Sequence, residues 1–403
     1  METNKPLLLT NLTIYAEDRT IENGYLRLKN EKIADYGSLD GYFFDEAEYE
    51  RVIKLSPSFS LIPGMIDVHV HGAGGCDTMD AVPDALKTIA ETLAQEGTTG
   101  FLATTITQDS HLIEKALCNA AEYIGAGQEP GKAEVLGVHL EGPFISRKRA
   151  GAQPLSHIKE PDTEVFKNWQ ELSKGHIKLV TLAPEEPGAH ELIRHLKASG
   201  AVASIGHSDA TYEQVEEAIN AGAAHVTHLF NGMRGIHHRE PGVMGAALLR
   251  DELTVELITD GIHARPEMIL LAYKQKPKEN VILITDSLRA KCMAPGTYDL
   301  GGQHVTVTET KAALEDGTLA GSMLKMKDAL VNYSRFTNCT MEELILAVST
   351  NPARQLNVLD RKGSIAEGKD ADLVILNKEK EVVMTICRGK IAFEKGGVDH
   401  GDH

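Results

Sequence analysis

The sequence of 403 residues lacks the patterns that mark secreted, membrane-spanning or nucleic-acid-binding proteins. Its five cysteines include no Cys-x-x-Cys pair, which argues against a disulfide framework and favours a reducing cytoplasm. Met1–Lys5 begins no apolar signal-peptide core, and no apolar run is long enough to span a bilayer. Acidic residues outnumber basic ones, 58 to 41, so we expect neither nucleic acid nor an acidic membrane as a partner.

Several motifs of nucleotide and nucleophile chemistry are missing as well. No Walker A pattern occurs, and no Gly-x-Ser-x-Gly sequence presents a serine nucleophile. The glycines of Gly72–Gly75 lack the third glycine of a dinucleotide-binding fingerprint at the required spacing. The sequence therefore supports neither a P-loop enzyme, nor a dinucleotide-binding enzyme, nor a serine hydrolase.

Between about residues 64 and 355, apolar strand-like runs alternate with amphipathic helical patterns. Eight such repeats predict a parallel sheet closed into a (β/α)8 barrel of the TIM type. A chain of this length accommodates such a barrel and a smaller unit. The expected strands are Met65–His71, Gly100–Ile106, Glu134–Glu141, Ile177–Ala183, Ala201–His207, Ala224–Leu229, Leu253–Thr259 and Val281–Asp286.

Short alternating apolar runs, broken by Asn, Gly and Asp turns, occur near both ends of the chain. We interpret them as one small β-sandwich domain assembled from both termini. A further hairpin is expected between Tyr298 and Leu319, near the barrel mouth. The expected domains are residues 1–60 plus 361–403 for the β-sandwich and 61–360 for the barrel.

Two histidines stand at positions i and i+2 in the first expected barrel strand. Side chains at this spacing project from the same face of a strand, so His69 and His71 converge. Converging imidazoles suit a divalent metal. A lone His-x-His pair fits two ordinary histidines equally well, so the metal hypothesis depends on the rest of the chain.

Four more metal-competent side chains end later expected strands. They are Glu141, His207, His228 and Asp286. Active sites of such barrels lie at the C-terminal ends of the strands, so all six side chains are expected at one face. The sequence therefore predicts a metal site there. His139 lies deeper in its strand and is expected to be a core or supporting group, and His225 is expected to be structural.

These residues belong to longer motifs that together resemble the amidohydrolase superfamily, and the resemblance runs over almost the whole chain. Three motifs carry the general resemblance, namely Ile66–Gly72, Thr285-Asp286 and Lys362–Val374. Seven others are similar to the branch of that superfamily that deacetylates phosphorylated amino sugars: His139–Phe144, Thr181–Glu185, Gly206–Ala210, His228–Met233, Arg239–Gly242, Asp260–His263 and Leu319–Ser322.

The resemblance implies a ligand set for the metal. Members that retain the first histidine pair bind two divalent ions, of zinc, iron, cobalt or manganese, with Glu141 bridging them. Other amidohydrolases carry a bridging carboxylated lysine on strand 4, and Val180–Ala183 has no lysine at that strand end. The implied metal ligands are His69, His71, Glu141, His207 and His228.

The resemblance also implies hydrolysis of the N-acetyl group of N-acetylglucosamine 6-phosphate to glucosamine 6-phosphate and acetate, in amino-sugar catabolism and cell-wall sugar recycling. Asp286 would transfer the proton, and Arg239 would bind the phosphate across a homodimer interface. Some relatives carry histidine in place of Gln153. The other implied substrate contacts are Ala152, Gln153, Asn231, Gly232, His238, Asp260, His263, Leu319, Ala320 and Gly321.

Two other interpretations remain open. An amidohydrolase acting on N-acyl amino acids or cyclic amides would not need Arg239, and its activity would not depend on a substrate phosphate. A non-catalytic barrel could serve as an interaction scaffold, although inactive relatives usually lose ligands and all six are present here. Metal analysis of the purified protein separates this last interpretation from the other two.

Overall fold

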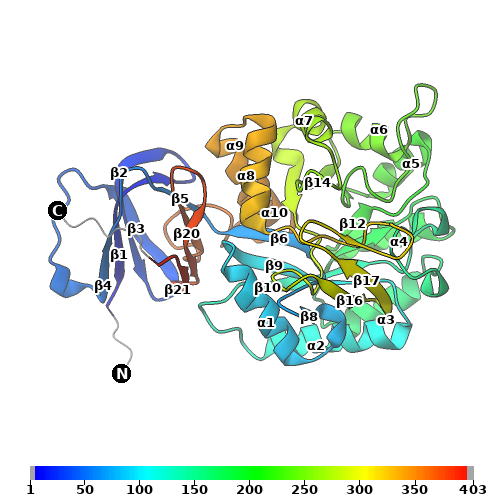
Figure 1. The fold of residues 1–403 in the computed structure, drawn as a ribbon, viewed down its shortest axis with the longest axis horizontal. Coiled ribbons are helices and arrows are strands. Elements are labelled where there is room, and N and C mark those ends of the chain that lie inside the picture. Colours follow the sequence, from blue (N-terminus) through cyan, green and yellow to red (C-terminus); the bar gives the residue numbers. More distant parts are fainter. Residues whose placement is uncertain (1–4, 397–403) are drawn as a thin grey trace.

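The computed structural model describes residues 5–396, which form two parts joined side by side (Figure 1). The larger part is a barrel of strands and helices. The smaller part is a β domain that contains the first and last described strands, blue and red in Figure 1. Residues 1–4 and 397–403 of the predicted β domain lie outside the described residues. Within residues 5–396, none of the helices has the length and apolarity that crossing a bilayer requires.

The strands of the β domain form one eight-stranded sheet, branched at β1, which pairs with β2, β4 and β5. The antiparallel pairing of β5 with β19 joins the N-terminal and C-terminal strands, as predicted. Alternate side chains of these strands pack into a separate apolar core. The strands are β1 Leu7–Tyr15, β2 Thr20–Lys29, β3 Lys32–Ser38, β4 Arg51–Lys54, β5 Ser60–Pro63, β19 Leu373–Leu376, β20 Val382–Cys387 and β21 Lys390–Glu394.

The second large sheet contains eight parallel strands in the order β15-β14-β13-β12-β11-β10-β9-β6. A parallel bridge between Val70 and Ser287 connects the two edges, which closes the predicted barrel. Nearly every strand residue is buried, because helices cover the outside. The strands are β6 Met65–Val70, β9 Thr98–Thr105, β10 Glu134–Glu141, β11 Ile177–Leu182, β12 Val202–Ile205, β13 His225–Val226, β14 Thr254–Ile258 and β15 Val281–Ile284.

The helices bury one apolar face against this sheet, and polar side chains begin several of them. Asp109 and Asp162 cap α2 and α3, and Thr211 forms a capping box with Gln214 at the start of α5. The helices are α1 Pro83–Ala94, α2 Ser110–Gly125, α3 Thr163–Leu172, α4 Ala189–Ser199, α5 Tyr212–Ala221, α6 Gly242–Leu249, α7 Pro266–Gln275, α8 Met326–Thr337, α9 Met341–Ile345 and α10 Asn351–Gln355.

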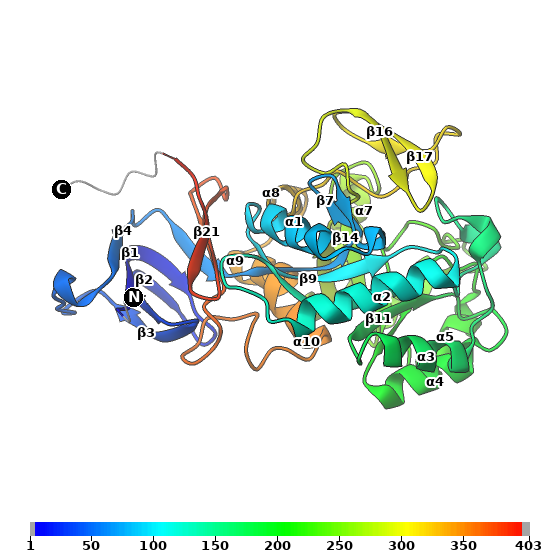
Figure 2. The ribbon, with the colours of Figure 1, turned by 90° about the horizontal axis from the view of Figure 1, so that it is seen from below.

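A small three-stranded sheet follows β15, in agreement with the predicted hairpin. It consists of β16 Gly296–Leu300, β17 Gln303–Val307 and β18 Ala312–Ala313. Figure 2 shows that it stands off from the rest of the barrel. Its inner face packs through Leu300 and Val305 against Ile106 and Leu288, which places it beside the ends of β9 and β15.

A buried cation lies where the β domain meets the barrel. Lys362 is only 2% exposed, and its Nζ lies 2.7 Å from Glu134 Oε2 of β10 and 3.2 Å from Asp370 Oδ2. It also bonds Asp372, just before β19. Burial alone would lower the pKa of Lys362, but the three carboxylates raise it, so this ammonium stays charged.

We therefore expect Lys362→Met to lower the free energy of unfolding by about 3–5 kcal/mol, because it leaves the buried Asp372 without its cation. The midpoint of urea denaturation measures the change. Lys395→Met is the matched control, since Lys395 Nζ lies 3.0 Å from Glu381 but both side chains are half exposed. Equal shifts in the two variants would contradict a special role for the buried cation.

Candidate metal centre

Six side chains from five strands meet at the C-terminal end of the barrel. His69 lies within β6 and His71 directly follows it, and Glu141 is the last residue of β10. His207, His228 and Asp286 each lie two residues beyond the end of a strand. Their backbones have φ angles of 46°, 31° and 49°, in the left-handed region that residues other than glycine rarely adopt. The chain therefore turns sharply at each of these positions. All six side chains are buried.

Three of these side chains form one group around a carboxylate. Glu141 Oε1 lies 3.3 Å from His207 Nε2 and 3.1 Å from His228 Nε2, and the two Nε2 atoms are 3.0 Å apart. Ligand-type atoms of all three lie within 4.8 Å of one another. One imidazole nitrogen from each histidine and a carboxylate oxygen thus face a common point.

His69, His71 and Asp286 form a second group with the same compactness. Asp286 Oδ1 lies 3.4 Å from His69 Nε2 and 3.3 Å from His71 Nε2. Glu141 also reaches this group, since its Oε1 is 3.4 Å from His69 Nε2 and its Oε2 is 3.2 Å from His71 Nε2. Glu141 therefore lies between the two groups, in contact with both.

The electrostatics of these groups favour a cation. Burial would raise the pKa of Glu141 and of Asp286, but His69 and its neighbours hold both below their usual values. Burial would lower the pKa of His71, yet hydrogen bonds to Asp286 and Glu141 raise it to about 9. His69 Nε2 is buried without a hydrogen bond. Ionised carboxylates beside imidazole nitrogens, one of them unsatisfied, are a donor set that fits a divalent metal.

Two of the imidazoles are also held from their far side. His207 Nδ1 lies 2.9 Å from the carbonyl oxygen of Arg149, and His69 Nδ1 lies 3.1 Å from Glu256 Oε2. A carbonyl oxygen only accepts hydrogen bonds, so Nδ1 carries the proton and donates, which leaves the Nε2 lone pair of His207 for a metal. The sequence alone does not indicate that Arg149 or Glu256 supports these imidazoles. The only signal for Glu256 is an acidic residue in an otherwise apolar strand.

His139 and His225 lie beside the centre and not in it, as expected. His225 Nε2 lies 3.0 Å from Glu256 Oε1. The ring of His139 packs edge-on against the ring of His69 at 4.5 Å, and its Nε2 lies 2.7 Å from Thr181 Oγ1. Burial and the neighbouring His69 hold the pKa of His139 well below its usual value, so this imidazole is neutral.

A cavity of about 260 Å³ opens above the two groups. Its floor is formed by five of the six metal-competent side chains, all except His69. Ile106 and Leu300 add apolar wall, which reduces contact with water. Among the predicted substrate-contacting residues, the structure places seven in this wall: Ala152, Gln153, Asn231, Gly232, His263, Leu319 and Gly321.

Two of these wall residues form hydrogen bonds with carboxylates. Gln153 accepts a bond from the Thr107 backbone N–H and donates to Glu141 Oε2, each at 2.8 Å, so it also orients that carboxylate. His263 Nδ1 lies 2.7 Å from Asp260 Oδ2. Burial would lower the pKa of His263, but Asp260 raises it. Asp260 thus acts on the cavity through His263.

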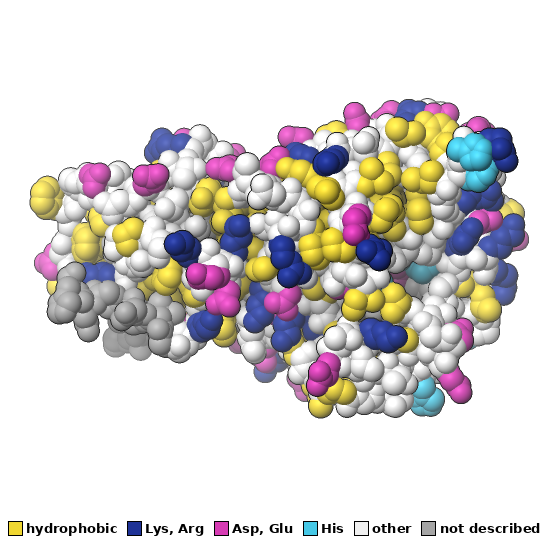
Figure 3. All heavy atoms as spheres, turned by 45° about the horizontal axis from the view of Figure 1, so that its top comes forward, with side chains coloured by type: hydrophobic (Ala, Val, Ile, Leu, Met, Phe, Trp, Pro, Cys, Tyr) yellow, Lys and Arg dark blue, Asp and Glu magenta, His cyan; other side chains and the backbone are white. Residues whose placement is uncertain are grey.

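Besides Asp260, three predicted contacts do not line this cavity. Ala320 is buried beneath its wall. His238 and Arg239 are exposed on the loop between β13 and α6, where Arg239 Nη1 lies 2.7 Å from His238 Nε2. Figure 3 shows basic and histidine side chains gathered at the end of the barrel that is distant from the β domain, although the chain carries a net charge of −17.

A larger cavity, of about 850 Å³, lies beside the β domain and offers no comparable chemistry. Its arginines are already bonded. Arg51 forms two hydrogen bonds with Glu394, and Arg388 donates to the carbonyls of Gln128 and Glu129. The smaller cavity above the ligand groups is therefore the candidate site.

Comparison with known proteins identifies relatives over the whole chain. Residues 60–392 match the sequence profile of the Amidohydrolase family. The chain is 49% identical over 388 residues to N-acetylglucosamine-6-phosphate deacetylase of Bacillus subtilis, covering 96% of this chain and 97% of that protein.

Two solved structures of enzymes with this name superimpose closely. The Thermotoga maritima enzyme is 35% identical, with a TM-score of 0.86 over 96% of this chain and 100% of that one. The Mycobacterium smegmatis enzyme, a mutant form in complex with N-acetyl-D-glucosamine 6-phosphate, is 29% identical, with a TM-score of 0.88 over 96% of this chain and 99% of that one.

Proposed function

Because this chain belongs to the amidohydrolase family, we propose that it hydrolyses the N-acetyl group of N-acetylglucosamine 6-phosphate to glucosamine 6-phosphate and acetate, using a divalent metal. The observation that carries the proposal is the convergence of six ligand-type side chains at the closed end of one cavity. All five cysteines of the chain are free thiols, which suits a reducing cytoplasm.

The reaction needs activation on both sides of the amide bond. An amide carbonyl is a poor electrophile, and the amine leaves only when it is protonated. A divalent metal at this centre would lower the pKa of bound water to about 7 and polarise the acetyl carbonyl. Asp286 is the group that can accept the proton of the attacking water and deliver it to the leaving nitrogen, since it lies at the cavity floor and is ionised.

The cavity wall would hold the sugar in register with this floor. His263, oriented by Asp260, can donate a hydrogen bond to the substrate, and Asn231 and Gly232 offer amide groups beside His228. Leu319 and Gly321 form another part of the wall. Holding the sugar in several places converts binding energy into orientation of the acetyl group.

Phosphate recognition would involve a second copy of the chain. Arg239 is exposed and lies outside the cavity of its own chain. A homodimer in which this loop reaches the neighbouring cavity would supply a guanidinium fork that matches phosphate oxygens. We propose this arrangement because no arginine or lysine lines the cavity within the described chain.

Acetate release tests both the function and Arg239. We expect rapid release from N-acetylglucosamine 6-phosphate and slow release from the unphosphorylated sugar. Losing one charge-assisted contact costs about 1.5–3 kcal/mol, so Arg239→Ala should lower kcat/KM for the phosphorylated sugar by roughly ten- to a hundredfold. The unphosphorylated sugar should be affected little.

Arg335→Ala is the control for this experiment, because Arg335 is exposed on α8 and its guanidinium contacts Asn332. Equal losses on both sugars would assign Arg239 to folding or to dimer assembly. Equal rates of the unmodified enzyme on both sugars would favour an amidohydrolase of N-acyl amino acids or cyclic amides.

The metal count follows from the position of Glu141 between two ligand groups. We expect two divalent ions per fully loaded chain, and one in His69→Ala, with activity reduced. Metal analysis of the purified proteins measures this, with His111→Ala, at an exposed position in α2, as the control. One ion per chain in fully active protein, with His69→Ala unimpaired, would contradict the two-metal proposal.

The role of Asp286 can be separated from metal binding. Asp286→Asn preserves shape and removes the proton acceptor, so kcat should fall by roughly 10²–10⁴ while KM changes little. Metal content should persist, because His69, His71 and Glu141 remain. Measuring kcat and bound metal on the same samples decides the matter: loss of metal in step with activity would make Asp286 mainly a ligand, and near-normal kcat would exclude it as the base.

A further inference from the structure

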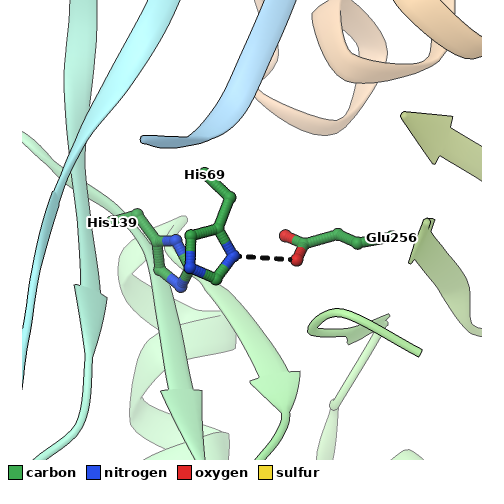
Figure 4. Close-up of side chains that lie close together, drawn as sticks. All are labelled: His69, His139 and Glu256. Atoms are coloured by element: carbon green, nitrogen blue, oxygen red, sulfur yellow. Dashed lines mark hydrogen bonds and ion pairs between the residues drawn. The ribbon is translucent and has the colours of Figure 1, made fainter. Parts of the chain in front are cut away.

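A second buried carboxylate lies directly beneath the metal centre. Glu256 is the central residue of β14, and none of its surface is exposed. Its Oε2 lies 3.1 Å from His69 Nδ1, the bond drawn in Figure 4, and 3.0 Å from the backbone nitrogen of His228. Its Oε1 lies 3.0 Å from His225 Nε2. A carboxylate in the barrel interior thus has a partner for each oxygen.

These contacts determine which nitrogen of His69 can bind a metal. A carboxylate only accepts hydrogen bonds, so the proton of neutral His69 must lie on Nδ1. Its Nε2 lone pair then faces Glu141 and Asp286. Such a carboxylate–histidine contact fixes both the tautomer and the orientation of a ligand.

The same oxygen acts on the other ligand group through the backbone. It accepts the N–H of His228, a residue whose φ angle of 31° is unfavourable for a side chain with a Cβ. This bond stabilises the turn that aims His228 Nε2 at Glu141. His225 meanwhile occupies the remaining oxygen. Glu256 therefore contacts one member of each ligand group. Among the hydrogen bonds and ion pairs of the described residues, no other side chain outside the two groups does the same.

A third metal site is the alternative explanation for this cluster. Ligand-type atoms of His69, His139 and Glu256 do lie within 4.8 Å of one another. However, the Nδ1 of His69 is already bonded to Glu256, and Figure 4 shows the ring of His139 packed against that of His69. His139 Nε2 is bonded to Thr181 and not to Glu256. The contacts thus favour a support for His69 over a separate ion.

We propose that Glu256 is a positioning residue that couples the two ligand groups, by fixing the Nδ1-protonated form of His69 and the backbone turn at His228. The inference rests on the proposed metal centre and adds to it. Removing such a support typically weakens metal binding by about 10–100-fold. Because Glu256 touches both groups, its loss weakens the binding of both ions and not of one alone.

Zinc binding to metal-free protein tests the proposal without any substrate. Zinc is titrated into the full-length protein against a competing chelator, and thermal melts of the metal-free samples report folding. Glu256→Ala should bind both zinc ions about 10–100-fold more weakly. Glu256→Gln keeps one acceptor oxygen and should be intermediate. If the alanine variant does not fold, the glutamine variant alone decides.

Thr181→Val is the matched control. It removes a buried hydroxyl from strand β11 of the same barrel with little change of shape, and Thr181 hydrogen-bonds His139 and Thr227 but no ligand. It should lower the melting temperature and leave zinc affinity unchanged. This separates general destabilisation of the barrel interior from positioning of the ligands.

Three results would overturn the proposal. Unchanged zinc affinity in both Glu256 variants, with only the melting temperature lowered, would make Glu256 merely structural. Weakening of a single ion would leave Glu256 as a support for His69 and contradict the coupling. If the unmodified protein bound no zinc, cobalt, iron or manganese, the proposed metal-dependent function itself would fail, and the inference with it.

Discussion

The mouth of the barrel concentrates charge on side chains that are almost wholly buried. Glu141 and Asp286 are ionised although burial opposes it, and the imidazoles around them compete for the same few oxygens. An isolated buried charge costs several kcal/mol, and hydrogen bonds among these side chains leave His69 Nε2 unsatisfied. A divalent cation would balance the charge of the buried carboxylates and would also bond the unsatisfied nitrogen of His69. The candidate ligands come from five different strands, because a closed parallel barrel aims its strand ends at one point.

The backbone bears part of the cost of this arrangement. Three of the six residues adopt left-handed backbone conformations, namely His207, His228 and Asp286. Each conformation costs on the order of 1–3 kcal/mol and persists only where neighbouring groups enforce it. Neighbours do enforce it. The Asp286 N–H donates to the His69 carbonyl at 2.9 Å, and the His228 N–H donates to Glu256. The strained turns and the bonds that hold them belong to the same few residues, so the ligand geometry is set before any metal binds.

The alternation of apolar and amphipathic runs was enough to predict the eight barrel strands, because each strand buries a continuous apolar segment. The convergence of the six candidate ligands was predictable for a related reason: polar residues that end apolar strands of a barrel share one face. Other features depend on neighbours that sequence spacing does not reveal. The strand before His228 contains only two residues, His225 and Val226, and a bend follows it. In the sequence, Glu256 is an unexplained acidic residue in an apolar strand. Its role becomes clear only when β14 lies beside β13, which carries His225. The family resemblance implied that Arg239 reaches the substrate across a homodimer interface, and in the structure Arg239 does not line the cavity of its own chain.

The floor and the wall of the cavity serve different purposes, the floor catalysis and the wall substrate preference. The floor is formed by buried side chains at strand ends that contact one another, so its geometry tolerates little change. The wall comes mainly from loops, including Gly151–Gln153 and Asn231-Gly232, and from Leu300 at the end of β16. Loops carried on a rigid scaffold can vary without disturbing the ligands. Substrate preference therefore depends on the wall and on any second copy that completes it, whereas the capacity to activate an amide depends on the floor. A change such as glutamine in place of histidine at Gln153 falls on the boundary, since this side chain lines the wall and also bonds the central carboxylate, Glu141.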